Sequence, residues 1–87
     1  MLHDIVEVRH IKDFTVFLVF DNGVQGEVDL SQFVTFEGVF AALSDISKFA
    51  EVFVEKDIGT ICWPNGADIA PETLYQCLVE QRTSRSA

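Results

Sequence analysis

The chain has 87 residues and a formal net charge of −8 at pH 7, and 48% of its residues are hydrophobic, including eight Phe. This length allows one domain, and an acidic body repels phosphate backbones, which argues against direct binding of nucleic acid. No segment reaches the ~20 apolar residues of a membrane span, and the N-terminus lacks the basic flank and apolar run of a signal peptide. We therefore expect a cytoplasmic protein that does not enter a membrane.

The charge is distributed unevenly along the chain. All 14 acidic residues but only four of the six basic residues lie within residues 1–81. Arg82 and Arg85 fall in the polar end of the sequence, so we expect one domain over residues 1–81 and a short basic tail over residues 82–87. A domain this small cannot bury all of its apolar side chains. Some of them are therefore expected to contact a protein partner or a second copy of the chain.

Three segments in the first third of the chain have the composition of strands. Residues 4–11 alternate weakly and are rich in Val and Ile, residues 14–20 form an almost unbroken run of β-formers, and residues 24–30 alternate apolar with polar. The short connections between them predict antiparallel pairing of neighbours in sequence.

The loop between the second and third strands fixes their register. With a two-residue loop, Phe20 would face Gln25, and each pair along the hairpin would mix an apolar with a polar side chain. With a three-residue loop over residues 21–23, Phe20 faces Val24, one face becomes apolar, and Gly23 falls where a positive φ is needed. A slip of one residue would reverse the faces, so we predict the three-residue loop.

This register leaves two apolar side chains, Phe17 and Val19, on the opposite face. Their predicted neighbours on the third strand are polar: Gln25, Glu27 and Asp29. Phe17 and Val19 therefore need cover, for which two sources stay open. One is the chain itself, through Val6 and Val8 or the C-terminal helix, and the other is a dimer or partner contact.

The remainder of the chain predicts two helices and a second pair of strands. Apolar residues at helical spacing indicate a short helix near 38–46, and β-formers indicate strands at 50–55 and 60–63. The segment 63–66 has the composition of a tight turn, and Pro71 suits the first turn of a C-terminal helix. We expect an α+β fold: a small antiparallel β-meander with a short middle helix and a C-terminal helix.

The residues that usually carry chemistry are dispersed. His3 and His10 project to opposite faces of a strand, so we expect no metal site. Cys62 and Cys77 lie in apolar patterns where cysteine behaves as a small hydrophobe, and they lack the close spacing of a disulfide scaffold or zinc knuckle. The single glycines form no phosphate-binding loop. We expect no cofactor and no enzymatic activity.

One cluster, residues 63–68, allows two interpretations. Trp63 could serve as a platform for a ligand that Asn65 and Asp68 orient. Alternatively, Trp63 fills the edge of the core, the following residues turn the chain, and Asp68 caps the last helix together with Glu72.

The segment Ile61–Tyr75 (ICWPNGADIAPETLY), with its Trp-Pro-Asn-Gly motif, resembles the signature of a bacterial family, domain of unknown function 2442. The FDNG hairpin at Phe20–Gly23 and the segment Gly38–Leu43 (GVFAAL) also follow the order of that family, and the resemblance covers roughly residues 3–80. It implies a small α+β fold and supplies no catalytic residue. Its association with genes of toxin–antitoxin type implies a regulatory role.

The sequence therefore supports two functions. The first is a non-enzymatic protein-interaction or regulatory module, with an antitoxin-like role as one form, which uses Phe17 and Val19 or an exposed strand edge. The alternative is a small-ligand-binding or accessory enzyme domain centred on Trp63, Asn65 and Asp68.

Overall fold

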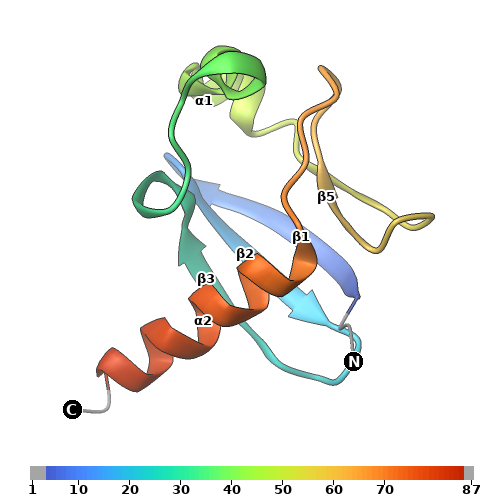
Figure 1. The fold of residues 1–87 in the computed structure, drawn as a ribbon, viewed down its shortest axis with the longest axis vertical. Helices are drawn as coiled ribbons and strands as arrows, with labels where there is room; N and C mark the ends of the chain where they lie inside the picture. Colours follow the sequence, from blue (N-terminus) through green and yellow to red (C-terminus); the bar gives the residue numbers. More distant parts are fainter. Residues whose placement is uncertain (1–3, 86–87) are drawn as a thin grey trace.

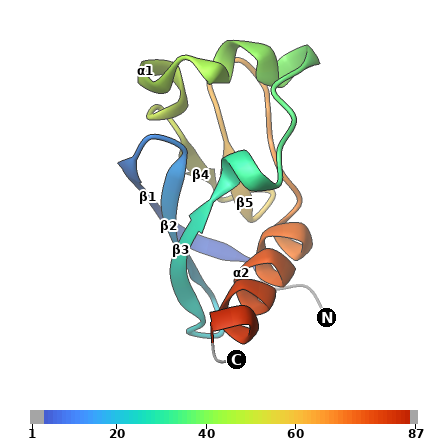
Figure 2. The ribbon, with the colours of Figure 1, turned by 90° about the vertical axis from the view of Figure 1, so that its left-hand side faces the viewer.

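The structure, a computed structural model, describes residues 4–85 and has the expected α+β fold. Its main sheet contains β1 (Ile5–Lys12), β2 (Thr15–Phe20) and β3 (Gln25–Asp29), antiparallel and in the order β1-β2-β3. The C-terminal helix α2 (Pro71–Arg85) crosses one face of this sheet (Figures 1 and 2). We call this side the inner face and the opposite side the outer face.

The hairpin between β2 and β3 has the predicted register. Leu18 lies opposite Gly26, and the Phe20 N–H donates to the Val24 carbonyl at 2.8 Å. Gly23 adopts a φ of 89°, a conformation that side chains with a Cβ disfavour. The three-residue loop is therefore confirmed.

The second part of the chain builds a smaller layer beside the main sheet (Figure 2). A short 3₁₀ turn follows β3, and a longer 3₁₀ helix and a single α-helical turn then lead into a two-stranded antiparallel hairpin. The bounds of these elements are η1 Leu30–Gln32, η2 Gly38–Ser44, α1 Ile46–Phe49, β4 Phe53–Glu55 and β5 Thr60–Cys62.

Two boundaries differ from the sequence prediction for local reasons. The predicted helix near 38–46 is a 3₁₀ helix that ends at Ser44, because Asp45 has an extended backbone and caps α1 through Ser47. The strand predicted from residue 50 begins only at Phe53, because the N–H groups of residues 51 and 52 bond back to carbonyls of α1.

The core lies between the inner face, α2 and β5. Val16, Leu18 and Phe20 of β2 are buried there, and burial of each such side chain contributes roughly 1.5–3 kcal/mol. The other buried hydrophobic residues are Ile5, Val28, Leu30, Leu43, Phe49, Ile61, Trp63, Ala67, Leu74, Cys77 and Leu78.

The C-terminal helix begins where the sequence predicted and extends further. Pro71 is its first residue and Glu72 lies in its first turn, where negative charge is favourable. The helix continues to Arg85, so the first four residues of the segment interpreted as a tail are helical. Within residues 4–85, no helix has the length and apolar character needed to cross a bilayer.

Candidate functional site

The outer face carries the two apolar side chains that the register predicted. Phe17 lies between Arg9 of β1 and Glu27 of β3, and Val19 lies between Glu7 and Gln25. Both apolar side chains are half-buried. The outer face is thus an apolar centre on β2 flanked by charged and polar positions on both neighbouring strands.

The C-terminal helix does not cover this face. Its Leu78 lies against Gly26, which pairs with the inward-facing Leu18, so α2 packs on the inner side. Val8 also pairs with Leu18 and packs against the core. Val8 and the C-terminal helix were two of the three intrachain sources of cover predicted for Phe17 and Val19. Both of these predictions are wrong.

The Arg9 guanidinium lies over the ring of Phe17. Its guanidinium carbon lies 4.9 Å from the centre of the Phe17 ring, and its Nε lies 3.3 Å from a carboxylate oxygen of Glu7. A cation over an aromatic ring at this distance is attracted by the negative face of the ring. Because the guanidinium remains largely exposed, this cover can move aside when another molecule approaches.

Further apolar side chains lie at the two irregular positions of β1. The pairing of β1 with β2 shifts between Ile5 and Glu7 and again between His10 and Lys12, which takes Val6 and Ile11 out of the regular alternation. Val6 is 55% exposed and Ile11 is 42% exposed. At the edge of the main sheet away from β1, the last strand is β3.

Trp63 belongs primarily to the core. It is only 2% exposed, and its indole Nε1 donates to the Phe49 carbonyl at 2.8 Å. Its ring also packs against Phe49 and Phe40, at centroid distances of 5.5 and 6.2 Å. The indole N–H is therefore already bonded inside the protein.

Asn65 holds the turn after β5 in place. Its amide nitrogen donates to the Val39 carbonyl at 2.9 Å, and its Oδ1 accepts from the Ala67 N–H at 3.1 Å. The Gly66 N–H closes the turn on the Trp63 carbonyl, and Gly66 has a φ of 93°. The predicted tight turn is confirmed, and the amide ties it to η2.

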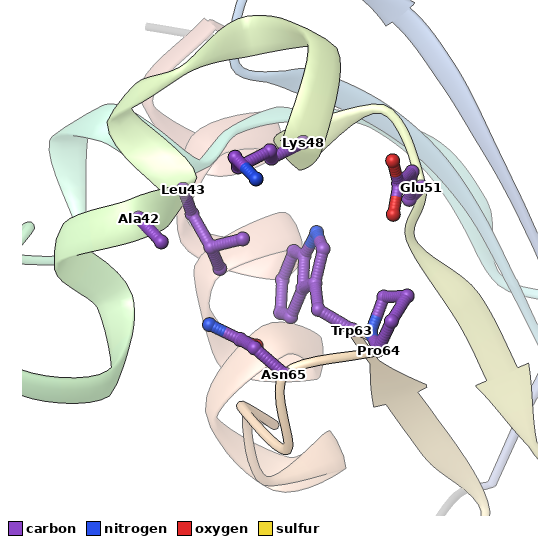
Figure 3. A pocket seen from close by; sticks show the side chains of 7 residues that line it. All are labelled: Ala42, Leu43, Lys48, Glu51, Trp63, Pro64 and Asn65. Carbon is purple, nitrogen blue, oxygen red and sulfur yellow. The ribbon is translucent and has the colours of Figure 1, made fainter.

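Trp63 and Asn65 line one pocket of about 290 Å³. Figure 3 shows the indole in its middle, Leu43 on one side, and Lys48 and Glu51 on the side away from Asn65. The remaining lining residues are Ala42 and Pro64. Sequence reasoning missed Lys48 and Glu51; the available signal was that Lys48 is a rare cation in an acidic domain.

Asp68 is not part of this pocket. It pairs with Cys62 in an isolated bridge beyond the turn, and its side chain is exposed. Because α2 begins only at Pro71, Asp68 precedes the N-cap position, and its carboxylate accepts no hydrogen bond among the described residues. The capping role predicted for Asp68 is therefore wrong.

The environment raises the pKa of both thiols. Burial raises the pKa of the Cys62 thiol, and the charges of Asp68 and Glu55 raise that pKa further. Burial and the charge of Glu80 likewise raise the pKa of Cys77. Since the thiolate is the reactive form, neither position favours covalent catalysis.

The histidines give no metal centre in the part of the chain that the structure describes. His10 Nε2 lies 2.8 Å from the Asp13 carbonyl oxygen, and its ring packs on Phe49. His3 lies outside the described residues. Within residues 4–85, no three His, Cys, Asp or Glu side chains are grouped as metal ligands would be.

Comparison with known families gives one match. The model of a family described as "Protein of unknown function (DUF2442)" matches residues 5–78, a range that includes the outer face and the pocket beside Trp63. Searches of curated proteins and of solved structures found no match.

Proposed function

This chain belongs to the DUF2442 family of proteins of unknown function, and we propose that it is a non-enzymatic protein-interaction or regulatory module of the cytoplasm. The outer face, centred on Phe17 and Val19, is its binding surface. An antitoxin-like role, in which the bound protein is held inactive, is the form of regulation that the family resemblance implies.

The observation that supports this proposal is the apolar strand centre on the side of the sheet away from α2. Phe17 and Val19 lie in the middle strand of the main sheet, and the C-terminal helix covers the other side. A partner that displaces the Arg9 guanidinium from Phe17 gains the burial of both side chains. At roughly 25 cal/mol per Å² of apolar surface, even a modest area favours association.

The charge of the surface favours a basic partner over a second copy of the chain. The outer positions of β1 and β3 carry the carboxylates Glu7, Glu27 and Asp29 beside the guanidinium of Arg9. Two copies would place like charges opposite one another, which is unfavourable. A protein with Lys or Arg around an apolar patch would be complementary, and nucleic acid would be repelled.

The exposed edge of β3 offers such a partner a second mode of attachment. A strand added beside β3 would extend the main sheet through main-chain hydrogen bonds, and its alternate side chains would lie next to the outer face. The apolar centre and the edge belong to adjacent strands, so one extended segment can use both.

The proposal is tested by affinity capture from the native host with the native chain and two variants, combined with size-exclusion chromatography and light scattering. Phe17→Ser with Val19→Thr should abolish capture of a discrete protein. Val39→Ser, which removes an exposed apolar side chain beyond the outer face, should leave capture unchanged. A strictly monomeric protein that recovers no specific partner, or equal loss in both variants, contradicts the proposal.

The alternative function, binding of a small ligand, is supported by the pocket beside Trp63. Trp63 and Asn65 both line it, whereas Asp68 lies outside, so the proposed site contains two of the three residues expected from sequence. Trp63 is the only Trp of the chain. A ligand in the pocket should therefore shift its fluorescence, and a metabolite screen without any shift contradicts this function.

A further inference from the structure

We infer that the pocket beside Trp63 takes a small zwitterion of amino-acid size, with Glu51 facing its ammonium group and Lys48 its carboxylate. This inference rests on the alternative function above, since it names the class of ligand for the same pocket. It concerns residues that the protein-interaction surface does not use.

The two charges of the pocket are not paired with each other, and the positive charge of Lys48 also attracts the nearby Asp45 carboxylate. Lys48 and Glu51 both line it and both are exposed. Within the described residues no ion pair joins them, although they are only three residues apart. Figure 3 shows the Lys48 amine above the indole and the Glu51 carboxylate to one side of it. A ligand with one group of each sign can satisfy both.

The other two polar side chains of the pocket already form hydrogen bonds within the protein. The indole N–H of Trp63 donates to the Phe49 carbonyl, and both ends of the Asn65 amide are bonded within the protein. The indole has no second hydrogen to donate, and the Asn65 amide keeps one N–H and one oxygen lone pair, so a neutral ligand finds few free side-chain groups to bond. Recognition in this pocket therefore depends on the charges of Lys48 and Glu51.

The volume and walls of the pocket limit the size of the ligand. At about 290 Å³, the pocket is at the lower end of the ~300–1,000 Å³ range of small-molecule sites. This volume suits a ligand of amino-acid size. Ala42, Leu43 and Pro64 supply apolar walls for a short aliphatic side chain.

The full chain labelled with ¹⁵N provides the test, because its single indole N–H gives one signal from a side chain that lines the pocket. We expect free alanine, valine or leucine to shift this signal at millimolar concentration. The N-acetyl amino acid lacks the cation, and the amino-acid amide lacks the anion. Each derivative should bind about fivefold more weakly, as expected for the loss of one exposed charge interaction.

Charge variants locate the effect. Lys48→Gln should weaken binding of the free amino acid about fivefold and leave binding of the amide unchanged. Glu51→Gln should weaken binding of the free amino acid about fivefold and leave binding of the N-acetyl form unchanged. Lys12→Gln and Glu37→Gln, which remove exposed charges outside the pocket, should bind like the native chain.

Two outcomes overturn the inference and can be told apart. If other metabolites shift the signal and no amino acid does, the zwitterion is wrong and ligand binding stands. If no compound shifts it, both are wrong. Unchanged affinity in the Lys48→Gln and Glu51→Gln variants also refutes the assignment.

Discussion

Trp63 illustrates how one side chain can link two layers of this small domain. Its ring packs against Phe40 and Phe49, and its indole N–H reaches the Phe49 carbonyl. We predict that Trp63→Phe lowers the free energy of unfolding by about 2–3 kcal/mol, because it leaves a void and removes a buried hydrogen bond. Urea unfolding followed by circular dichroism measures this, with the exposed Phe33→Leu as control. Equal stability of the two variants would contradict a core role for the indole.

Asp45 couples the short helix α1 to pH. The hydroxyl and N–H of Ser47 donate to its carboxylate and lower its pKa below the ordinary value of 3.8. The ionised carboxylate therefore contributes stability above pH 3.8, and this contribution is lost as the pH falls through the lower pKa of the folded state.

We predict that Asp45→Asn flattens the acid limb of stability, because the amide keeps an acceptor for Ser47 but no longer titrates. Unfolding midpoints in urea between pH 7 and pH 2.5 check this. Asp57→Asn serves as the control, since the Asp57 carboxylate accepts no hydrogen bond within residues 4–85. If the unfolding midpoints of the native chain and of Asp45→Asn fell equally with decreasing pH, ionisation of Asp45 would not contribute to the acid dependence of stability.

At the scale of elements, the packing of α2 on β3 depends on the absence of a side chain at Gly26. A Cβ there would lie 2.8 Å from a methyl carbon of Leu78. We predict that Gly26→Ala costs about 1–3 kcal/mol of stability through overpacking. In a double-mutant cycle, Gly26→Ala with Leu78→Ala should cost less than the sum of the single changes, since the clash is removed. Simple additivity would contradict direct contact.

The β2–β3 turn gives a second prediction at this scale. With a φ of 89° at Gly23, Gly23→Ala should lower stability by about 1–2 kcal/mol, whereas Gly23→Asn should cost less because Asn tolerates left-handed backbone. Thermal unfolding of both variants measures the difference. Since a Cβ at Gly23 would meet no atom within 4 Å, an equal cost for Ala and Asn would mean that backbone strain does not set the turn.

The sequence was sufficient for elements whose pattern is local and insufficient where distant segments meet. The hairpin register followed from alternation and one glycine, and the turn at Trp63–Gly66 followed from its composition. The 3₁₀ character of η2 was missed, because Val39, Phe40 and Leu43 have apolar spacing that suits either helix type. The pocket was only partly predicted, because Lys48 joins Trp63 through folding and not through sequence proximity.

At the scale of the whole molecule, a compact fold with a net charge of −8 carries an apolar centre on the outer face of its main sheet. The radius of gyration of 12.3 Å is close to the ~12 Å expected for a compact chain of this length. The half-exposure of Phe17 therefore occurs in a well-packed domain. Substitution of Phe17 and Val19 by polar residues should therefore weaken association with a partner much more than it lowers the stability of the fold.

The most direct test of this account is site-specific photocrosslinking in the native host. A photoreactive amino acid in place of Val19, at the centre of the outer face, should trap one discrete protein. The same group in place of Val39, which is more exposed than Val19 but lies in η2, should not trap it. Binding through the outer face would be contradicted if the protein were crosslinked from position 39 alone. It would also be contradicted if affinity capture still recovered the protein but position 19 gave no crosslink to it.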